Sequence, residues 1–381
     1  MSEIKVNSIK GVGASSAAIT VNNSDGTCTA NLTNRTNKNL ILNGAFLIAQ
    51  RGTSSTTSGY GSVDRFDCEY SGTDENPTQA QVDVASGTTP YTQGFRKAFK
   101  ITNGNQTSGA GSSDVIRFST KLEAQDIANS GWNYTSSSSF ITLSFWIKSS
   151  VAQNFYFRAQ AIDGTSQAYT METGSLSADT WTKITKTIPG NSNLTFDNNN
   201  GEGFLIRFSA FIGTDNTGTR PLNAWAAYDG STRYPDNTST WYTTNDATLE
   251  VTGFQLEVGS VATDFEHRSF AQELALCQRY LFKNINESGE NGCNYAKAYS
   301  TSELFASVRF PVAMRSTPTV IVYGNQGAAG TVHKLGGLPD KSVTSVDRLD
   351  AYGGMRLNSS SQWATGDTDM YSFTFQAESE L

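Results

Sequence analysis

The stretch Phe140-Ile141-Thr142-Leu143-Ser144-Phe145-Trp146-Ile147-Lys148 decides the fold class. Its apolar side chains recur at every second residue from Ile141 to Ile147. The residues between them are polar, except for Trp146. Because successive side chains of a β-strand point to opposite faces of a sheet, the apolar set lies on one face. The pattern therefore predicts an antiparallel strand that packs on one side.

The same alternation recurs in several segments on either side of this stretch. Residues 204–212 and 155–159 each place apolar side chains at every second position, and residues 95–101 do so except at Lys97. Turn-rich segments separate these stretches. Many short strands over about 230 residues are typical of a two-sheet jelly-roll sandwich. We therefore predict a mainly β, antiparallel jelly-roll β-sandwich over residues 41–268.

The alternation changes phase near the end of this region. Leu249 and Val251 form one apolar set, whereas Phe254 and Leu256 form another that is out of step with it. The slip falls at Gly253, and glycine is the residue that accepts a bulge conformation most readily. We predict a β-bulge at Gly253.

The segments outside the sandwich differ from it in pattern. Phe270, Leu274, Cys277 and Leu281 recur at helical spacing, and Ser269 followed by Gln272 fits a capping box. This spacing predicts a helix over 269–283, within a linking segment of residues 269–287. Alternation returns at 304–310 and 371–375, which predicts a smaller C-terminal β domain over residues 288–381.

Residues 1–40 hold few large apolar side chains and cannot bury a core alone. We interpret them as an attachment arm that folds against a partner or against copies of itself.

Composition excludes several classes of function. The 381 residues include 34 Gly, only 17% charged residues and a net charge of −7, so the chain is a poor ligand for nucleic acid. No run of eighteen apolar residues exists, so we predict no membrane insertion. The four cysteines, Cys28, Cys68, Cys277 and Cys293, form no CxxC pair, and we expect unpaired structural thiols.

Three stretches together resemble phage tail-fibre and related virion appendage proteins of the marine phage type. Residues 1–9 are similar to the opening of such fibre proteins. Residues 42–52 with Asp64-Arg65-Phe66 are similar to the start of a carbohydrate-binding-type jelly roll in phage fibres. The run from Phe254 to Tyr280 is similar to the closing strand and the following helix of the same family. The resemblance covers residues 1–10 and 41–320, and no extended shaft is visible between residues 10 and 40.

The resemblance implies a jelly-roll module on a virion, usually a homotrimer, that is exposed to host-surface glycans. It implies that the N-terminal arm binds other tail or capsid proteins. On this basis we assign virion attachment to Ile4, Val6 and Ile9. The polar N-terminus and the scattered cysteines indicate synthesis in the host cytoplasm.

The loop 213–247 is the predicted glycan site. Flat aromatic rings stack on the apolar faces of sugars, and Asn and Asp side chains bind the hydroxyls. Arg220 and Arg233 are suited to acidic sugars. The alternative is that the rings cover the end of the sandwich or pack against a neighbouring subunit. The predicted glycan-binding residues are Trp225, Tyr228, Tyr234, Trp241 and Tyr242.

Catalytic and metal-binding patterns are missing from the sequence. The only histidines are His267 and His333, and no HExxH, GxSxG or phosphate-binding glycine loop occurs. We expect a structural role for His267. Segment 197–202 offers oxygen ligands on a turn but fails the EF-hand pattern, so an Asx-rich turn is favoured over a calcium site. We predict no catalytic residue, no metal and no cofactor.

Three functions remain open at this point. The first is an adhesin that binds host glycan and anchors by its N-terminus. The second is a capsid- or tail-mounted connector or decoration without glycan binding. The third is a polysaccharide-degrading tailspike enzyme, which needs a pair of carboxylates across a cleft, such as Glu123 with Asp126 or Glu250 with Glu257.

Overall fold

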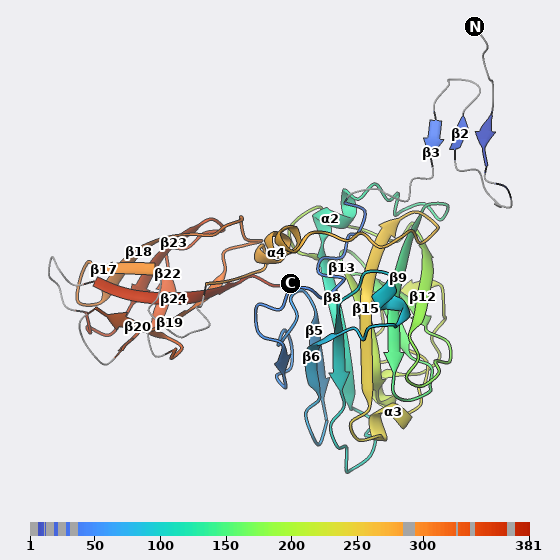
Figure 1. The fold of residues 1–381 in the computed structure, drawn as a ribbon, viewed down its shortest axis with the longest axis horizontal. Helices are drawn as coiled ribbons and strands as arrows, with labels where there is room; N and C mark the ends of the chain where they lie inside the picture. Colours follow the sequence, from blue (N-terminus) through green and yellow to red (C-terminus); the bar gives the residue numbers. More distant parts are fainter. Residues whose placement is uncertain are drawn as a thin grey trace, which may run out of the picture.

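The computed structural model describes residues 7–10, 12, 19–21, 28–30, 37–284, 294–324, 327–335, 340–363 and 370–381. Its largest part is an antiparallel β-sandwich, beside which a smaller β domain lies (Figure 1). The predicted fold class, mainly β with a sandwich and a second β unit, is confirmed.

Two sheets form the sandwich (Figure 1). The first has the strand order β14-β11-β10-β13-β8-β5 and the second has the order β12-β9-β15-β7-β6-β4. The strands of the first sheet are β5 (Asp67–Ser71), β8 (Val115–Glu123), β10 (Tyr156–Ala161), β11 (Gln167–Glu172), β13 (Glu202–Ile212) and β14 (Trp225–Ala227). Those of the second are β4 (Ser54–Ser55), β6 (Thr78–Asp83), β7 (Lys97–Thr102), β9 (Phe140–Ser149), β12 (Thr182–Pro189) and β15 (Thr248–Val258). The connecting loops contain α1 (Thr89–Thr92), α2 (Ala124–Ala128), the 3₁₀ turn η1 (Thr214–Asn216) and α3 (Thr240–Thr243).

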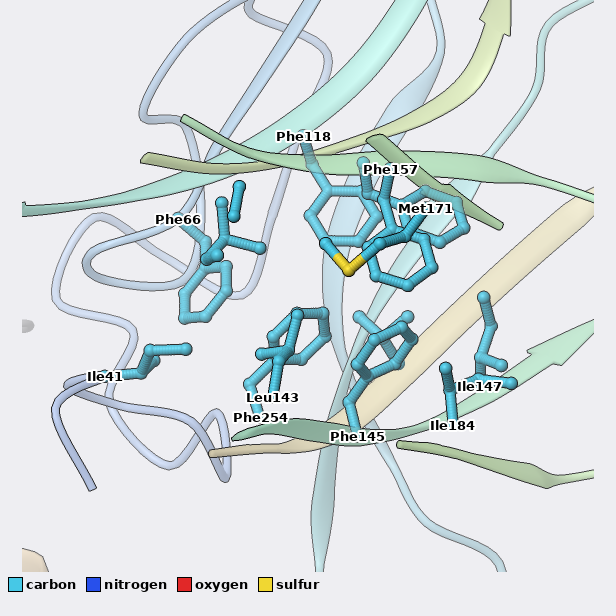
Figure 2. Packing of buried hydrophobic residues seen from close by; sticks show 14 of the residues in the cluster. Ile41, Phe66, Phe118, Leu143, Phe145, Ile147, Phe157, Met171, Ile184 and Phe254 are labelled. Carbon is cyan, nitrogen blue, oxygen red and sulfur yellow. The ribbon is translucent and has the colours of Figure 1, made fainter. Parts of the chain in front are cut away.

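The core lies between the two sheets and is rich in phenylalanine. The rings of Phe145 and Phe254 stack with their centroids 4.5 Å apart, and those of Phe118 and Phe208 stack at 5.1 Å. Such ring pairs add stabilisation beyond the apolar area that they bury. Figure 2 shows Phe118, Phe157 and Met171 of one sheet facing Leu143, Phe145 and Phe254 of the other.

The alternating stretch forms β9 as predicted, but it is covered on both faces. Apolar residues from Ile141 to Ile147 face the core. On the outer face Thr142 and Ser144 are also buried, and Trp146 is only 8% exposed. The prediction of a strand packed on one side is therefore wrong. Residues 259–268 fold back over the outer face, where the Thr142 hydroxyl donates to the Gly259 carbonyl oxygen at 2.8 Å.

The predicted β-bulge is confirmed in β15. The register of β15 against β9 shifts between Thr252 and Gln255. Gly253 has a φ of +69°, a left-handed conformation that side chains other than glycine rarely adopt. A Cβ atom at Gly253 would also lie 2.7 Å from the ring of Phe95.

The C-terminal β domain forms a curled sheet around its own core. Its strand order is β21-β20-β24-β17-β18-β23-β22, and β16 and β19 also pair with the long strand β24. Inward residues of β24 (Tyr371, Phe373 and Phe375) are fully buried, as the alternation predicts. The strands are β16 (Leu281–Lys283), β17 (Asn294–Ala298), β18 (Glu303–Arg309), β19 (Thr319–Tyr323), β20 (Thr331–Lys334), β21 (Lys341–Ser342), β22 (Ser345–Asp347), β23 (Gly353–Asn358) and β24 (Met370–Glu378).

The predicted linking helix is present but shorter than expected. Helix α4 spans Phe270–Gln278, and the Ser269 hydroxyl accepts a hydrogen bond from the Gln272 amide as its N-cap. The predicted apolar stripe is wrong at its ends, because Phe270 is 61% exposed and Leu281 already belongs to β16. Two described cysteines, Cys68 and Cys277, are buried and free, as expected.

The described residues of the N-terminal arm form β1 (Ser8–Ile9), β2 (Ile19–Val21) and β3 (Cys28–Ala30), which pair in this order. Ile9 is 54% exposed, and Ile4 and Val6 lie outside the described residues. Among the described residues, none of β1, β2 or β3 belongs to a hydrophobic cluster, whereas Leu40 at the end of the arm packs against the sandwich core. Among the described residues, no helix is long and apolar enough to span a membrane.

Candidate functional site

The aromatic residues of the loop 213–247 pack mostly onto the sandwich itself. Tyr234, Trp241 and Tyr242 are at most 1% exposed. The Tyr242 ring stacks on Phe211 at 4.3 Å, and its hydroxyl donates to the Asp114 carboxylate at 2.9 Å. A ring that is buried in this way offers no face to a sugar. This corrects the prediction that the rings of the loop form one stacking surface.

Trp225 and Tyr228 are half-buried and also have partners within the fold. The indole N–H of Trp225, on edge strand β14, donates to the Pro189 carbonyl oxygen on β12 at 2.7 Å. Trp225 therefore bridges the two sheets at an open edge of the sandwich. The ring of Tyr228 lies 5.1 Å from the buried guanidinium of Arg158. The loop thus serves chiefly to close the sandwich, which was the alternative interpretation of its rings.

A pocket on the outer face of the second sheet brings together a different set of side chains. We call it the outer-face pocket, and its volume is about 330 Å³. Its floor is the central part of β9 and β15, where Trp146 lies beside the bulge at Gly253. Residues 263–267 and the segment after α1 form the walls. The lining residues are Gln93, Phe95, Ser144, Trp146, Lys183, Gly253, Thr263, Asp264, Phe265 and His267.

The walls of the outer-face pocket are aromatic and held rigidly. The ring of Phe265 packs edge-on against Phe95 at 4.9 Å, and the His267 ring lies 4.9 Å from Phe265. Nε2 of His267 lies 2.9 Å from the Gln93 carbonyl oxygen, and the Trp146 indole N–H donates to the Gln93 side chain at 3.2 Å. His267 therefore has the expected structural role, and it also lines the pocket.

Polar groups at the rim face the solvent. Lys183, Asp264 and Gln93 are exposed. In the described part of the chain no ion pair involves Lys183 or the Asp264 carboxylate, whereas Lys148 on the same sheet pairs with Glu250 at 3.0 Å. The rim thus offers a cation, a carboxylate and an amide above an aromatic floor.

A larger groove of about 850 Å³ lies along α4 and has a different character. Its lining includes the aliphatic residues Leu40, Leu42 and Leu276, and its ring, Tyr280, is buried. Its arginines already bind carboxylates, as Arg279 does with Glu123 at 2.7 Å. The outer-face pocket differs from this groove in having the half-buried ring of Phe265 in its wall and, at its rim, exposed polar groups without ion pairs to the described residues.

The carboxylate pairs considered for glycan cleavage have other roles in the fold. Glu123 is buried and accepts hydrogen bonds from Arg279 and Tyr280. Burial alone would raise the pKa of Glu123, but these hydrogen bonds outweigh it and hold the pKa below its ordinary value. Glu250 and Glu257 lie seven residues apart on one strand, about 23 Å at the usual rise per residue. The Glu123 carboxylate is thus held by Arg279 and Tyr280, and the separation of Glu250 and Glu257 far exceeds the roughly 5–9.5 Å between two catalytic acids.

The turn at residues 197–202 is the Asx-rich turn that the sequence favours. The Asn199 side chain accepts a hydrogen bond from the Gly201 amide at 2.7 Å. Within the described ranges, no group of His, Cys, Asp or Glu side chains is arranged to hold a metal ion.

Comparison with known proteins gives structural likenesses alone. No protein-family model matches the chain, and no curated protein matches it. Its structure is similar to the enzymatically active domain of tailspike protein 4 from bacteriophage CBA120, at 9% identity and a TM-score of 0.31. That likeness covers 58% of this chain and 21% of the tailspike chain.

Carbohydrate-binding modules show the same level of likeness. The family 11 module from Clostridium thermocellum, in complex with a β-1,3-1,4-mixed-linked tetrasaccharide, has 12% identity and a TM-score of 0.25, over 56% of this chain and 98% of that one. The C-terminal family 22 module of Clostridium thermocellum Xyn10B has 8% identity and a TM-score of 0.29, over 60% of this chain and 100% of that one. TM-scores this low carry no argument about function.

The sequence contained one signal for the outer-face pocket. Trp146 is a large ring within the polar set of an alternating strand, a position where a side chain either faces solvent or lines a covered site. The other lining residues are spread from Gln93 to His267 and share no motif. Only the fold brings them together.

Proposed function

We propose that this chain is a non-enzymatic glycan-binding protein whose sandwich holds a sugar residue in the outer-face pocket. The observation that carries the proposal is the combination of an aromatic floor and wall, Trp146 and Phe265, with unpaired polar groups at the rim. The volume of about 330 Å³ is at the lower end of ligand pockets, which span roughly 300–1,000 Å³. This size fits a terminal or single sugar residue better than a long stretch of polysaccharide.

The chemistry of a sugar matches these groups. The C–H faces of a pyranose are apolar and pack on aromatic rings, whereas its equatorial hydroxyls need hydrogen-bond partners. Lys183 supplies a donor and Asp264 an acceptor, and Gln93 retains further hydrogen-bonding capacity at the rim. The walls are already ordered by their contacts with one another, so little conformational entropy is lost on binding.

We further propose that the chain is a phage appendage, a tail fibre or a related receptor-binding protein, which anchors by residues 1–40 and forms a homotrimer. The support is the sequence resemblance, which is most extensive over residues 254–280. Several of these residues have structural roles in the fold: Glu266 accepts the Asn39 amide at 2.8 Å, and Arg268 donates to the Asn39 carbonyl oxygen at 2.5 Å. Detection of the chain in purified phage particles, with cross-linking to a tail or capsid protein, tests this part.

The double substitution Lys183→Ala/Asp264→Ala tests the pocket. Both side chains are exposed, so the fold remains intact. A glycan array first identifies the best ligand of wild type, and calorimetry then measures the affinity of both proteins for it. We expect the affinity of the double variant to be lower by roughly tenfold or more, because hydrogen bonds to charged groups contribute about 1.5–3 kcal/mol.

Two control variants separate the pocket from the loop. Lys186→Ala removes a lysine from the same strand, β12, but not from the pocket, and leaves affinity unchanged. Tyr228→Ala removes the half-buried tyrosine of the loop and also leaves affinity unchanged if the pocket is the site. A loss in Tyr228→Ala without a loss in the pocket variant would assign binding to the loop. Binding to no glycan at all would favour a connector role.

A further inference from the structure

The C-terminal sheet exposes a row of aromatic and cationic side chains on its outward face. We call this set the C-terminal outer face. Inward residues of the same strands, such as Leu304 and Ala296, belong to the domain core. The face lies over β17, β18 and the first residue of β24, and Arg348 follows directly after β22; these strands are drawn in orange and red in Figure 1. Its members are Tyr295, Lys297, Tyr299, Phe305, Arg309, Arg348 and Met370.

Strand register places these side chains together. Lys297 on β17 is directly opposite Phe305 on β18 and Met370 on β24. Residues two apart on a strand share a face, so Tyr295 lies on the same face of β17 as Lys297. Tyr299 follows directly after the end of β17 at Ala298. The Tyr299 and Phe305 rings are in edge contact at 5.6 Å.

The rings are open to solvent to an unusual degree. Tyr299 is 75% exposed, Tyr295 53%, Met370 44% and Phe305 36%. A contiguous exposed apolar patch of this kind on a folded domain marks an interaction surface. The aromatic rings lie on adjacent strands of a rigid sheet, so they form a fixed stacking platform.

The charge on this face is opposite to that of the whole chain. The Arg348 guanidinium lies 5.5 Å from the Phe305 ring, and in the described part of the chain Lys297, Arg309 and Arg348 make no ion pair. Arg356 is matched by Asp347 at 2.6 Å and Glu303 at 2.5 Å. Three unmatched cations thus gather here in a chain of net charge −7.

We propose that the C-terminal outer face binds an acidic polysaccharide, one whose repeating unit carries a carboxylate or sulfate. Lys297 and Arg348 pair with the anionic groups, and the Tyr295, Tyr299 and Phe305 rings stack on the sugar faces between them. An extended polymer is the ligand because the platform is an open sheet face. This surface is separate from the outer-face pocket and does not depend on it.

A second copy of the chain fits this face less well. The cores of protein interfaces are depleted of charged residues, and lysine in particular. Lys297 lies at the centre of the patch, with apolar side chains opposite it on both sides. Burying it against another subunit would require a carboxylate partner, whereas a polyanion supplies one with every repeat.

The test uses the full chain, with alginate as the polyanionic probe and laminarin as the neutral one, in affinity electrophoresis. Wild type is expected to be retarded by alginate but not by laminarin, and added salt weakens the retardation because charge attraction is screened. Two variants, Lys297→Glu/Arg348→Glu and Tyr299→Ala/Phe305→Ala, should each weaken alginate binding by roughly tenfold or more. The controls Phe270→Ala and Arg96→Glu change an exposed aromatic and an exposed cation elsewhere and should bind as wild type does.

The pocket variant Lys183→Ala/Asp264→Ala distinguishes this proposal from the proposed glycan binding by the outer-face pocket. If the pocket variant loses alginate binding and the two face variants keep it, the C-terminal outer face plays no part in binding and the proposal is wrong. Absence of alginate binding by wild type also overturns it, and so does alginate binding by both face variants that equals that of wild type. The proposal is also wrong if wild type binds duplex DNA more tightly than alginate. It is wrong as well if sedimentation velocity shows that the face variants form a smaller oligomer than wild type, because the face would then be a subunit interface.

Discussion

Asp64 is a buried carboxylate whose charged form is disfavoured by burial and favoured by its hydrogen-bond partners. Its side chain is fully buried and accepts hydrogen bonds from the amide and the side chain of Gln50, at 2.8 and 2.5 Å. Burial penalises the charged form and raises the pKa of Asp64 to about 6, although the hydrogen bonds and nearby Arg51 partly oppose this. The folded state therefore binds this proton more tightly than the unfolded chain does.

The pKa of Asp64 predicts a pH dependence of stability with a definite sign. Its contribution is fully present below the unfolded pKa near 4 and is lost as the pH rises through 6. Between pH 7 and pH 5, wild type should gain about 1 kcal/mol in unfolding free energy relative to Asp64→Asn, measured by urea denaturation. Asp83→Asn, at a carboxylate that is 82% exposed, provides the baseline for removing a surface carboxylate. A difference between wild type and Asp64→Asn that does not vary with pH would contradict the assignment.

At the scale of the element, β15 connects the core to the outer-face pocket. Before the bulge its side chains Leu249 and Val251 face the core, and after it Phe254 and Leu256 do. A strand without the bulge would turn one of these pairs outward, because a shift of one residue exchanges the faces. The bulge therefore allows one strand to serve the core along its whole length, and Gly253 at the slip forms part of the pocket floor.

Gly253→Ala should destabilise the sandwich and narrow the pocket. The left-handed φ strains any residue with a Cβ, and the added methyl would lie 2.7 Å from the Phe95 ring. Overpacking and strain of this kind cost about 1–3 kcal/mol each. Urea denaturation measures the loss. Gly230→Ala, whose Cβ would meet only the Tyr228 hydroxyl at 4.0 Å, is the matched control, with an effect within about 0.5 kcal/mol. Equal stability of the two variants would mean that neither the positive φ at Gly253 nor the nearby Phe95 ring requires glycine at the bulge.

At the scale of the whole molecule, residues at the end of β24 join the two cores. The Glu380 carboxylate binds the guanidinium of Arg65, which is buried in the sandwich and lies 3.4 Å from the centre of the Tyr280 ring. Arg315 of the C-terminal domain donates to the Glu380 and Ser379 carbonyl oxygens, at 2.9 and 2.7 Å. Burial by itself would lower the pKa of Arg65, but Glu380 together with the nearby Tyr280 and Tyr60 outweighs burial and raises the pKa, so this guanidinium stays charged in the fold.

Glu380→Ala should uncouple the two domains. Removing one partner of a buried ion pair leaves the other charge uncompensated, at a cost of about 3–5 kcal/mol. Calorimetry should then resolve two unfolding transitions where wild type shows one, with the sandwich transition lowered in temperature. Asp83→Ala breaks the exposed pair with Lys97 and should leave the thermogram unchanged. A single unshifted transition in Glu380→Ala would show that this contact does not couple the domains.

The elements of this protein could be predicted from its residues because strand alternation, the glycine bulge and the N-cap are local. The period of two at residues 140–148 follows from backbone geometry, Gly253 from its freedom at positive φ, and Ser269 from its side-chain cap. Each depends on neighbours a few residues away, so the pattern is visible without the fold.

Burial and convergence could not be predicted in the same way. Trp241 and Tyr242 are of the residue types that stack on sugars, yet they are buried at the end of the sandwich. Lys183 and Phe265 share a pocket with Trp146 because a return segment crosses the outer face of β9. Which rings are covered and which distant side chains meet depends on long-range packing, and one sequence alone carries no local trace of that packing.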